Sequence, residues 1–375
     1  MKILINAISA KKGGAKVIVN SFINNMPDDN NEYHFLVNSG VLKNDSYKLK
    51  ENIFIHENNI GSEGKFKRLW WDQVILPQYI KKNKFEYMIN LSNYGPMFPN
   101  CKQILLLHNA KHISKEIKSS YTFKEKIELF VQDCILRVSL LGVYKLVVQT
   151  NYMKEGVVNK FRFNSNKIFI IPNAPNEILS EQIDYNLEKK LEDFINCESN
   201  ILSDITLYGK HKNLELLLYS IKYIKDNRLG KVKLILTIDP TKGNDNKRLI
   251  DMIRELGIEE YVYSVGLVKH ENIHQILNRS KIFVFPSYAE SFGLPFVEAM
   301  KFGLPIVAAD LGFAHDVCGN AALYFKYNNS KELAIKIIEI FSNENLMNEM
   351  SNESLKQGSK YQEGEIVKKY ISLLS

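Results

Sequence analysis

Short apolar runs alternate along this chain with longer segments in which apolar residues recur at helical spacing. The short runs predict buried strands, the longer segments predict helices, and their alternation is typical of parallel sheets covered by helices. In the first half, the expected strands are Lys2–Asn6, His34–Val37, Ile53–Ile55, Tyr87–Asn90, Gln103–Leu107, Lys145–Gln149 and Ile168–Ile171. In the second half, they are Ile205–Leu207, Lys233–Ile238, Val262–Ser264, Ile282–Phe285 and Ile306–Ala309.

A proline-containing segment divides the pattern into two parts. Pro172 and Pro175 interrupt regular structure, and a polar stretch follows to about Asn200 before a new strand begins. We therefore expect two doubly wound α/β domains, residues 1–175 and 176–360, with a C-terminal helix at 361–375 packing back on the first. Ligands of such sheets bind outside the carboxyl ends of the strands, so a cleft between the domains is the expected site.

Composition agrees with a folded protein of two domains. The 375 residues are 45% hydrophobic and 24% charged, with a net charge of +7. A basic balance favours an anionic partner, although a lysine-rich solvated surface explains it equally well. Four cysteines stand far apart, which suggests neither a zinc site nor a disulfide framework.

No signal peptide or membrane span is predicted, so we expect a cytoplasmic protein, with peripheral attachment to the inner face of the plasma membrane left open.

The segment that begins at Ile282 carries the candidate chemistry. An apolar strand ends at Pro286, a loop carries Glu290 and Gly293, and Pro295 stands where a helix should begin. Glycine lets a ligand approach the backbone, and a helix start suits a phosphate. Glu298, one turn later, could accept hydrogen bonds from vicinal hydroxyls. From spacing alone, a strand, loop and helix without a ligand is at least as good an interpretation.

The wider sequence around these glutamates resembles family 4 of the retaining GT-B glycosyltransferases, the glycosyl transferases group 1. Glu290 and Glu298 are separated by seven residues, as in that family. The likeness continues through the segments Phe292–Pro295, Glu298–Met300, Gly303–Val307 and Asp316–Phe325. It implies a GT-B architecture and transfer of a hexose from a UDP- or GDP-sugar to an acceptor hydroxyl. An oligosaccharide or lipid-linked acceptor in surface polysaccharide assembly, with no metal and no further cofactor, is implied by analogy.

The resemblance implies that the domain at 1–175 binds the acceptor and the domain at 176–360 binds the nucleotide-sugar donor. It also implies roles for individual residues. Glu290 and His108 would contact the transferred sugar, Glu298 would hold the ribose, and Gly266 would lie near the base. The backbone groups implied to face the sugar and the diphosphate are those of Phe292, Gly293 and Leu294. His112 is a weaker alternative to His108, and for either histidine a structural loop role stays open.

Glycines and lysines near two helix starts are further candidates for donor binding. Lys212 matches the family's phosphate-binding lysine, but the arginine that usually accompanies it is missing. Lys210 could replace that arginine or could be an exposed loop lysine, and a lysine lacks the bidentate fork of arginine. Gly13 and Gly14 follow the first strand, where glycines suit either close approach of a ligand or a tight turn.

A lysine-rich stretch between Lys111 and Lys126 includes Tyr121 and Phe123. Such a stretch could rest on an anionic membrane or could simply be a solvated loop. No zinc-finger or RNA-recognition motif is present, so nucleic-acid binding is not expected. Two alternatives to a transferase stay open. One is a GT-B nucleotide-sugar enzyme of other chemistry, such as an epimerase, and the other is a non-catalytic scaffold.

Overall fold

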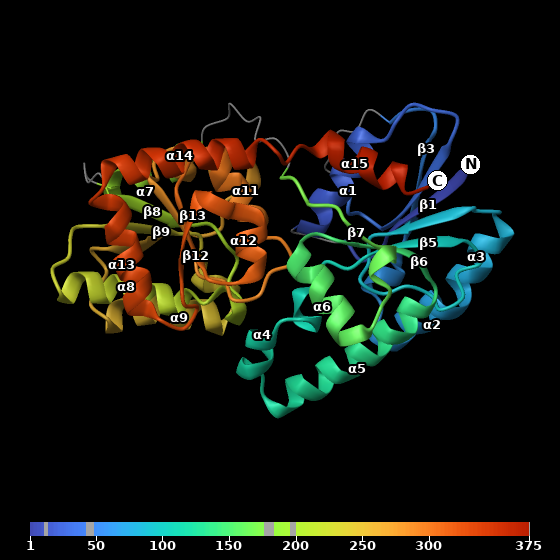
Figure 1. Cartoon of the computed structure of the whole chain (residues 1–375), viewed down its shortest axis with the longest axis horizontal. Helices are drawn as coiled ribbons and strands as arrows, with labels where there is room; N and C mark the ends of the chain where they lie inside the picture. The colour runs from blue at the N-terminus through green and yellow to red at the C-terminus, as the bar shows by residue number, and fades with distance from the viewer. Residues whose placement is uncertain (11–13, 43–48, 176–183, 196–199, 375) are drawn as a thin grey trace. The chain divides into compact units, whose positions relative to one another are not determined.

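A computed structural model describes residues 1–10, 14–42, 49–175, 184–195 and 200–374. The chain forms two compact units. The first comprises Met1–Asn176 together with Tyr361–Ser375, and the second comprises Glu177–Lys360 (Figure 1). Each unit is built on one sheet of parallel strands with helices packed against it, so the expected doubly wound α/β class is confirmed.

The sheet of the first unit has seven strands in the order β3-β2-β1-β4-β5-β6-β7. Chain order reverses between β1 and β4, and this switch point lies near the middle of the sheet. The strands are β1 Lys2–Ala7, β2 Glu32–Asn38, β3 Ile53–Asn58, β4 Tyr87–Asn90, β5 Lys102–Leu106, β6 Val143–Val148 and β7 Ile168–Ile170.

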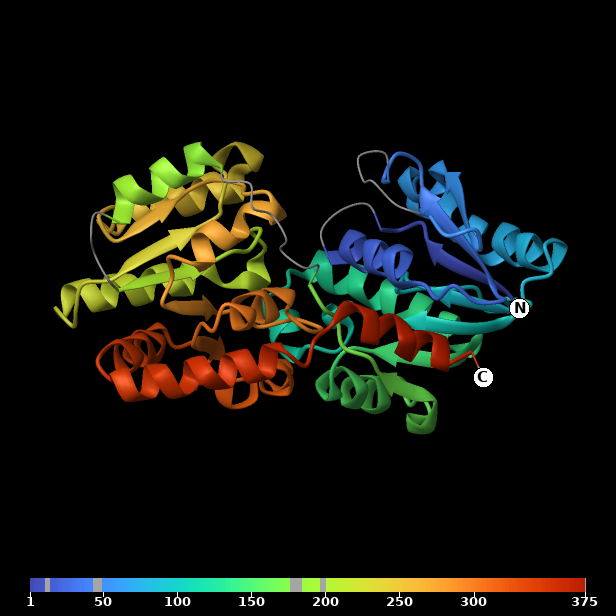
Figure 2. The ribbon, with the colours of Figure 1, turned by 90° about the horizontal axis from the view of Figure 1, so that it is seen from above.

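Helices cover the first sheet because its strands are apolar on both faces. They are α1 Gly14–Asn25, α2 Lys65–Trp70, α3 Leu76–Lys82, α4 Lys115–Ser120, α5 Phe123–Leu141, α6 Asn151–Phe161 and α15 Glu363–Ser372. A π-helical turn, Trp71–Ile75, joins α2 to α3. α15 packs on α1, where the rings of Tyr370 and Phe22 meet edge to face with centroids 4.9 Å apart (Figures 1 and 2).

The second unit has six strands in the order β10-β9-β8-β11-β12-β13, with its switch point between β8 and β11. The strands are β8 Ile201–Asp204, β9 Lys233–Leu236, β10 Val262–Ser264, β11 Ile282–Phe285, β12 Ile306–Ala309 and β13 Ala322–Phe325. The helices are α7 Tyr185–Ile195, α8 Leu214–Asp226, α9 Asn244–Glu255, α10 Ile273–Leu277, α11 Leu294–Lys301, α12 Gly312–Cys318, α13 Ser330–Phe341 and α14 Glu344–Gly358.

One predicted strand was wrong in position. The strand expected at Ile205–Leu207 is β8, Ile201–Asp204, and residues 205–207 follow it as a loop. Two polar residues inside the strand hide it from a hydrophobic pattern. Ser203 is fully buried and accepts a hydrogen bond of 2.8 Å from the hydroxyl of Ser280, and Asp204 is 1% exposed. Because buried polar groups need partners, only the folded sheet reveals why these residues are tolerated in a strand.

Among the described residues, no helix combines the length and the apolar character required to cross a bilayer.

Candidate functional site

The switch point of the second unit brings together two loops that are far apart in sequence. The turn Lys210–Lys212 follows β8, and the loop from Pro286 to Gly293 follows β11. Lys212 Nζ donates a hydrogen bond of 2.6 Å to Glu290 Oε1, and both side chains are only 16% exposed. A buried charge pair at the carboxyl ends of central strands marks this edge as the candidate site.

Two further hydrogen bonds tie the two loops, and a third, within the second loop, holds Glu290. Ser287 Oγ donates to Glu290 Oε1 at 2.8 Å and to the carbonyl oxygen of His211 at 3.0 Å. That same carbonyl accepts the backbone N–H of Tyr288 at 2.9 Å. Because the carboxylate is held from several directions, it is fixed before any ligand arrives.

The charge states around Glu290 follow from burial and from Lys212. Burial raises the pKa of Glu290, but the Lys212 charge, His211 and the two hydrogen bonds outweigh it and hold that pKa below its ordinary value. Burial lowers the pKa of His211, whose Nε2 lies 3.9 Å from Glu290 Oε1. At neutral pH, Glu290 is therefore a carboxylate and the His211 ring is neutral.

A buried acid, Asp204, neighbours this pair and was not anticipated from the sequence. Its Oδ1 accepts a 2.6 Å hydrogen bond from Thr206 Oγ1, whereas its buried Oδ2 has no hydrogen-bond partner among the described residues. Burial raises the pKa of Asp204 to about 7, against the opposing effects of Thr206 and Lys212. The sequence does not single out Asp204, because Ser203 and Asp204 together look like the start of a loop.

Gly293 shapes the start of helix α11. It has φ 89° and ψ 68°, a left-handed conformation that favours glycine, and no side chain caps the helix. A Cβ at this position would lie 2.7 Å from Cδ2 of Phe296. Of its two predicted neighbours, Phe292 is buried and Leu294 is half-buried. The uncapped start leaves the positive end of the helix dipole available to an anion.

Glu298 lies on α11, one turn beyond this start, and is 6% exposed. Its Oε1 is 2.9 Å from Nε2 of His270, a contact that sequence reasoning missed because the two residues are remote along the chain.

Gly266 follows β10 with φ 87° and has open space where a Cβ would stand. Lys210 shares the turn of Lys212, but its side chain is exposed. The described residues include no group of three or more potential metal ligands.

The remaining candidates belong to the first unit. Gly13 lies outside the described residues, and Gly14 is the first residue of α1. His112 is fully buried, and its ring contacts Asp133 at 2.9 Å and the Tyr94 hydroxyl at 3.0 Å, which gives it a structural role.

His108 follows β5, and Asn93 fixes its ring. Asn93 Oδ1 accepts a hydrogen bond from the backbone N–H of His108 at 2.9 Å. The side-chain nitrogen of Asn93, Nδ2, therefore faces His108 Nε2, at 3.3 Å. Nε2 is then the acceptor, which places the proton on Nδ1. Burial lowers the pKa of His108 to about 4, so the ring is neutral at pH 7. Nδ1 is buried without a hydrogen-bond partner in the part of the chain that the structure describes.

Comparison with protein families gives one match. The family described as glycosyl transferases group 1 matches residues 158–357, which is more than half of the chain. That stretch contains every candidate residue of the second unit.

Individual relatives are distant. The O-antigen chain mannosyltransferase RfbU of Salmonella typhimurium is 24% identical over 238 residues, 63% of this chain and 62% of that protein. A phosphatidylinositol N-acetylglucosaminyltransferase subunit, gpi3 of Schizosaccharomyces pombe, is 24% identical over 230 residues, 60% of this chain and 48% of the subunit. The chain thus spans about three fifths of the length of RfbU and about half of the length of gpi3.

Among solved structures, HepE of Anabaena in complex with UDP and glucose superposes with a TM-score of 0.73 at 16% identity. The superposition covers 100% of this chain and 99% of HepE. At this identity the likeness shows the fold, and the expected GT-B architecture is confirmed.

Proposed function

Because this chain belongs to the group 1 glycosyl transferases, we propose that it moves a hexose from a nucleotide-diphosphate sugar to a hydroxyl of an oligosaccharide or lipid-linked acceptor. The observation that carries the proposal is the Lys212–Glu290 pair beside the uncapped start of α11. A cation and a helix start suit a diphosphate, whereas a fixed carboxylate suits sugar hydroxyls. HepE, which shares the fold, was solved with UDP and glucose.

Each side chain has a proposed part in holding the donor. Glu290 accepts hydrogen bonds from the donor sugar, and Lys212 shares its charge between Glu290 and the diphosphate. Glu298, oriented by His270, binds the ribose, and Gly266 leaves room for the base. The neutral His108 donates from Nδ1 to the transferred sugar.

We propose retention of the anomeric configuration. The acceptor oxygen bonds to the anomeric carbon on the face from which the diphosphate departs. The bond from that carbon to the diphosphate oxygen breaks, and the departing phosphate oxygen takes the acceptor proton. Lys212 and the α11 dipole stabilise the charge that grows on the leaving group, which is the main catalytic contribution of the protein. No metal ion is required in this proposal.

Nucleotide release from a panel of UDP- and GDP-sugars, with lipid-linked and free oligosaccharides as acceptors, tests the function. Glu290→Gln should lower turnover about 100-fold or more because a carboxylate partner of the transition state is lost. Glu339→Gln, which disrupts a partly exposed ion pair with Lys336 on α13, is the matched control and should leave turnover unchanged. Undiminished turnover in Glu290→Gln would contradict the assignment, and conversion of the donor sugar without any acceptor would indicate an epimerase.

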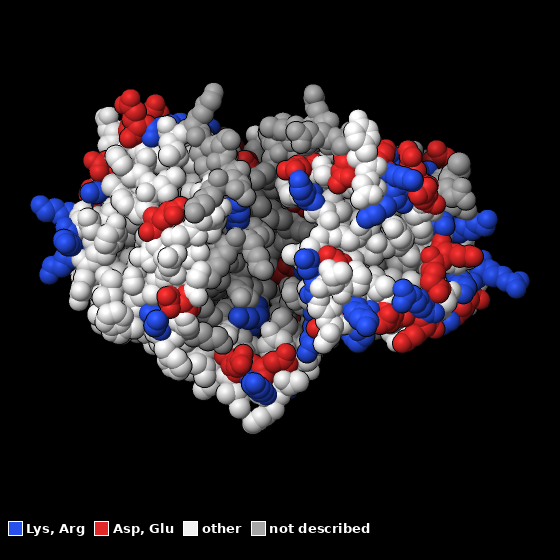
Figure 3. Space-filling model, turned by 180° about the vertical axis from the view of Figure 1, so that it is seen from behind, with Lys and Arg blue, Asp and Glu red and all other residues white. Residues whose placement is uncertain are grey.

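The proposed setting is cell-surface polysaccharide synthesis of the O-antigen or capsule type, as the name of RfbU suggests for that relative. Lipid-linked acceptors of such pathways lie in a membrane, so peripheral membrane contact follows as part of the proposal. Figure 3 shows basic and acidic side chains interspersed on the face in view, so the charge on that face does not by itself select a membrane.

Helix α5 offers a better candidate for that contact. Six of its large apolar side chains are 43% to 80% exposed, namely Phe123, Ile127, Phe130, Val131, Val138 and Leu141. Their spacing puts them on one side of the helix, opposite the buried Leu129, Leu136 and Leu140. Exposed Lys124, Lys126 and Arg137 flank this apolar face. An apolar stripe with basic flanks fits an anionic bilayer surface.

Co-sedimentation with phosphatidylglycerol vesicles tests the α5 contact. The wild-type chain should bind at low salt, and Phe130→Ser should reduce binding several-fold because less apolar surface enters the bilayer. Ile335→Ser removes a comparable exposed side chain from α13 and should have no effect. Equal binding of both variants would contradict a contact through α5.

A further inference from the structure

Asp204 ends β8, a central strand that forms one side of the switch point in the second unit. Its side chain is buried, with 1% exposed. Oδ1 accepts a hydrogen bond of 2.6 Å from Thr206 Oγ1, whereas Oδ2 is buried without a hydrogen-bond partner in the described part of the chain. A charge on this carboxyl group is costly, because burial removes it from solvent and one hydroxyl compensates for only part of that loss.

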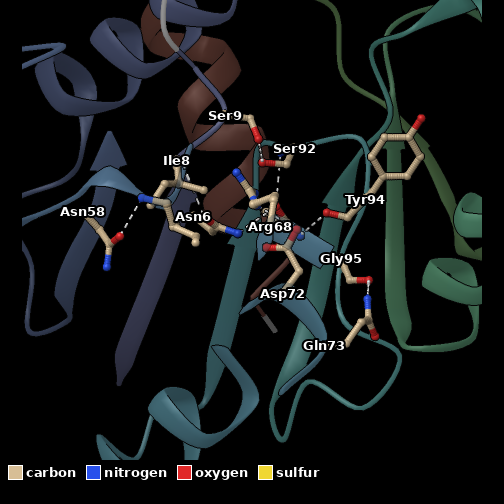
Figure 4. A network of polar contacts seen from close by, with 12 residues as sticks. Asn6, Ile8, Ser9, Asn58, Arg68, Asp72, Gln73, Ser92, Tyr94 and Gly95 are labelled. Carbon is tan, nitrogen blue, oxygen red and sulfur yellow. Dashed lines mark hydrogen bonds and ion pairs between the residues drawn. The ribbon is translucent and has the colours of Figure 1, made fainter. Parts of the chain in front are cut away.

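A second buried aspartate shows what usually holds such a charge. Asp72, in the π-helical turn of the first unit, is 8% exposed, and Arg68 Nε donates a hydrogen bond of 2.8 Å to its Oδ2 (Figure 4). Burial raises the pKa of Asp72, and the guanidinium opposes that rise. Asp204 receives its hydrogen bond from a neutral hydroxyl instead. With that weaker partner, burial raises the pKa of Asp204 to about 7.

The topology of the sheet brings the charge of Lys212 close to Asp204. β8 pairs with β11, and Phe285 is the last residue of β11. Lys212 Nζ lies 4.9 Å from the centroid of the Phe285 ring and donates its hydrogen bond to Glu290. The Lys212 charge lowers the pKa of Asp204, and the Glu290 charge raises it. Because electrostatic interactions are mutual, a charge on Asp204 acts in turn on Lys212 and on any anion beside it.

Ionisation of Asp204 changes the charge of the donor site by one elementary charge. Lys212 and Glu290 form an ion pair, so their charges largely offset each other. Two further titratable side chains belong to the same turn: that of Lys210 is exposed, and burial lowers the pKa of His211. Whatever these groups contribute, loss of the Asp204 proton adds a negative charge beside the ion pair, where water screens it poorly. An anionic diphosphate is then bound less tightly.

We propose that Asp204 is a positioning residue that controls donor binding through Lys212. The second unit binds a nucleotide-diphosphate sugar tightly while Asp204 holds a proton and weakly once that proton is lost. The inference rests on the proposed function and adds a controlling group to the same donor site. Because binding and protonation are linked, a bound diphosphate favours the protonated carboxyl, and the protein takes up protons from solution as the donor binds.

Calorimetric titration with UDP- and GDP-sugars, including UDP-glucose and GDP-mannose, tests this inference between about pH 6 and pH 8.5. Both phosphates of such a donor are esterified, so the charge of the diphosphate does not change over this range. Buffers with different ionisation enthalpies reveal how many protons are taken up. The wild type should bind roughly tenfold more tightly at the acid end, and proton uptake should be largest just above pH 7.

Asp204→Asn should remove most of the pH dependence above about pH 7, together with the proton uptake. At pH 8.5 it should bind the donor roughly tenfold more tightly than the wild type, because no buried negative charge develops. A merely structural role of Asp204 does not predict this gain of affinity. Asp226→Asn changes a partly exposed ion pair with Lys222 on α8 and, as the matched control, should follow the wild type.

Thr206→Val tests the same inference even if Asp204→Asn does not fold. The Thr206 hydroxyl lowers the pKa of Asp204, so its removal should move the loss of donor affinity to higher pH. A transition that stays where it is in the wild type would overturn the inference. Equal affinity of Asp204→Asn and the wild type at pH 8.5 would overturn it as well.

His211 is the other group that could make donor binding depend on pH, since its Nε2 lies 3.9 Å from Glu290 Oε1. Because burial lowers the pKa of His211, its protonation belongs to the acid side of the range. His211→Gln should therefore keep the transition near pH 7 and the proton uptake that accompanies it. Disappearance of both in His211→Gln would assign the titration to the histidine and overturn the role of Asp204.

The wild-type titrations separate this inference from the proposed function. Absence of binding across the whole panel of UDP- and GDP-sugars, at every pH, would contradict the proposed function. Donor binding that is independent of pH and takes up no protons would contradict only the role of Asp204.

Discussion

At the scale of single residues, Asp204 should make the stability of the fold depend on pH. Burial raises its pKa to about 7, so between its ordinary pKa and pH 7 the folded chain binds a proton that the unfolded chain has lost. Its contribution to stability is therefore present at acid pH and is lost as the pH rises through about 7.

Asp204→Asn should make the free energy of unfolding depend less on pH. At pH 8 the variant should be more stable than the wild type by a few kcal/mol, because no buried carboxylate has to ionise. Near pH 4, where Asp204 is largely protonated in the folded chain and close to its ordinary pKa in the unfolded chain, the two proteins should differ little. Urea unfolding at a series of pH values measures the effect, and parallel curves for the two proteins would contradict it.

The two lysines of the turn after β8 should behave differently. Lys212→Met removes the partner of Glu290 and should lower nucleotide-diphosphate affinity roughly tenfold or more, because a buried cation at the diphosphate is lost. Lys210→Met is the matched change in the same turn, and an exposed loop lysine should cost less than about threefold. Calorimetric titration with UDP and GDP compares them, and equal losses would assign Lys210 to the phosphate site.

Sequence reasoning identified residues that belong to a continuous motif but not those that only the fold brings close. Glu290, Gly293 and Glu298 stand within one short segment, and Lys212 occupies a recognisable position before a helix. Asp204 and His270 belong to no such segment. Their significance depends on burial and on partners such as Thr206 and Glu298, which a single sequence does not display.

At the scale of elements, the start of α11 depends on a glycine for two separable reasons. Gly293 and Gly266 both have positive φ, at 89° and 87°, so alanine is strained at either position. Only at Gly293 would the new Cβ also meet a neighbour, Phe296, at 2.7 Å.

Gly266→Ala should cost about 1 kcal/mol of unfolding free energy, and Gly293→Ala should cost about 1 to 3 kcal/mol more, because overpacking adds to backbone strain. Urea denaturation of both variants measures the difference. Equal destabilisation would mean that Phe296 moves aside without cost and that backbone conformation alone requires the glycine.

The predicted elements show where a hydrophobic pattern is sufficient to locate a strand or a helix and where it is not. Strands such as Ile282–Phe285 and Ile306–Ala309 match the prediction because an unbroken apolar run has no other good interpretation. β8 was displaced because Ser203 and Asp204 make it look like a loop. The π-turn at Trp71–Ile75 leaves no mark in the hydrophobic pattern, since periodicity does not register a single widened turn.

At the scale of the whole molecule, the first unit is assembled from two distant stretches of chain. Tyr370 of α15 is 2% exposed and packs on Phe22, and Lys145 Nζ donates a 2.9 Å hydrogen bond to the carbonyl oxygen of Leu373. Tyr370→Ala should therefore destabilise the first unit by about 3 to 5 kcal/mol through lost packing.

Tyr370→Phe is the control, because it keeps the ring and removes only the hydroxyl. Hydrogen exchange resolved by segment measures both variants. Faster exchange in Tyr370→Ala should appear in residues 1–176 and leave residues 200–360 nearly unchanged. Uniformly faster exchange across the whole chain would show that the two units unfold together.

The position of α15 also sets the order in which the chain can mature during synthesis. Residues 177–360 leave the ribosome as a continuous stretch and hold a complete sheet, so the second unit can fold as soon as it emerges. The first unit, although made earlier, lacks a packing partner for α1 until Glu363–Ser372 has been translated. The half of the protein that is translated first is thus the half that is finished last, and for that interval the apolar surface of α1 is open to chaperones or to misassembly.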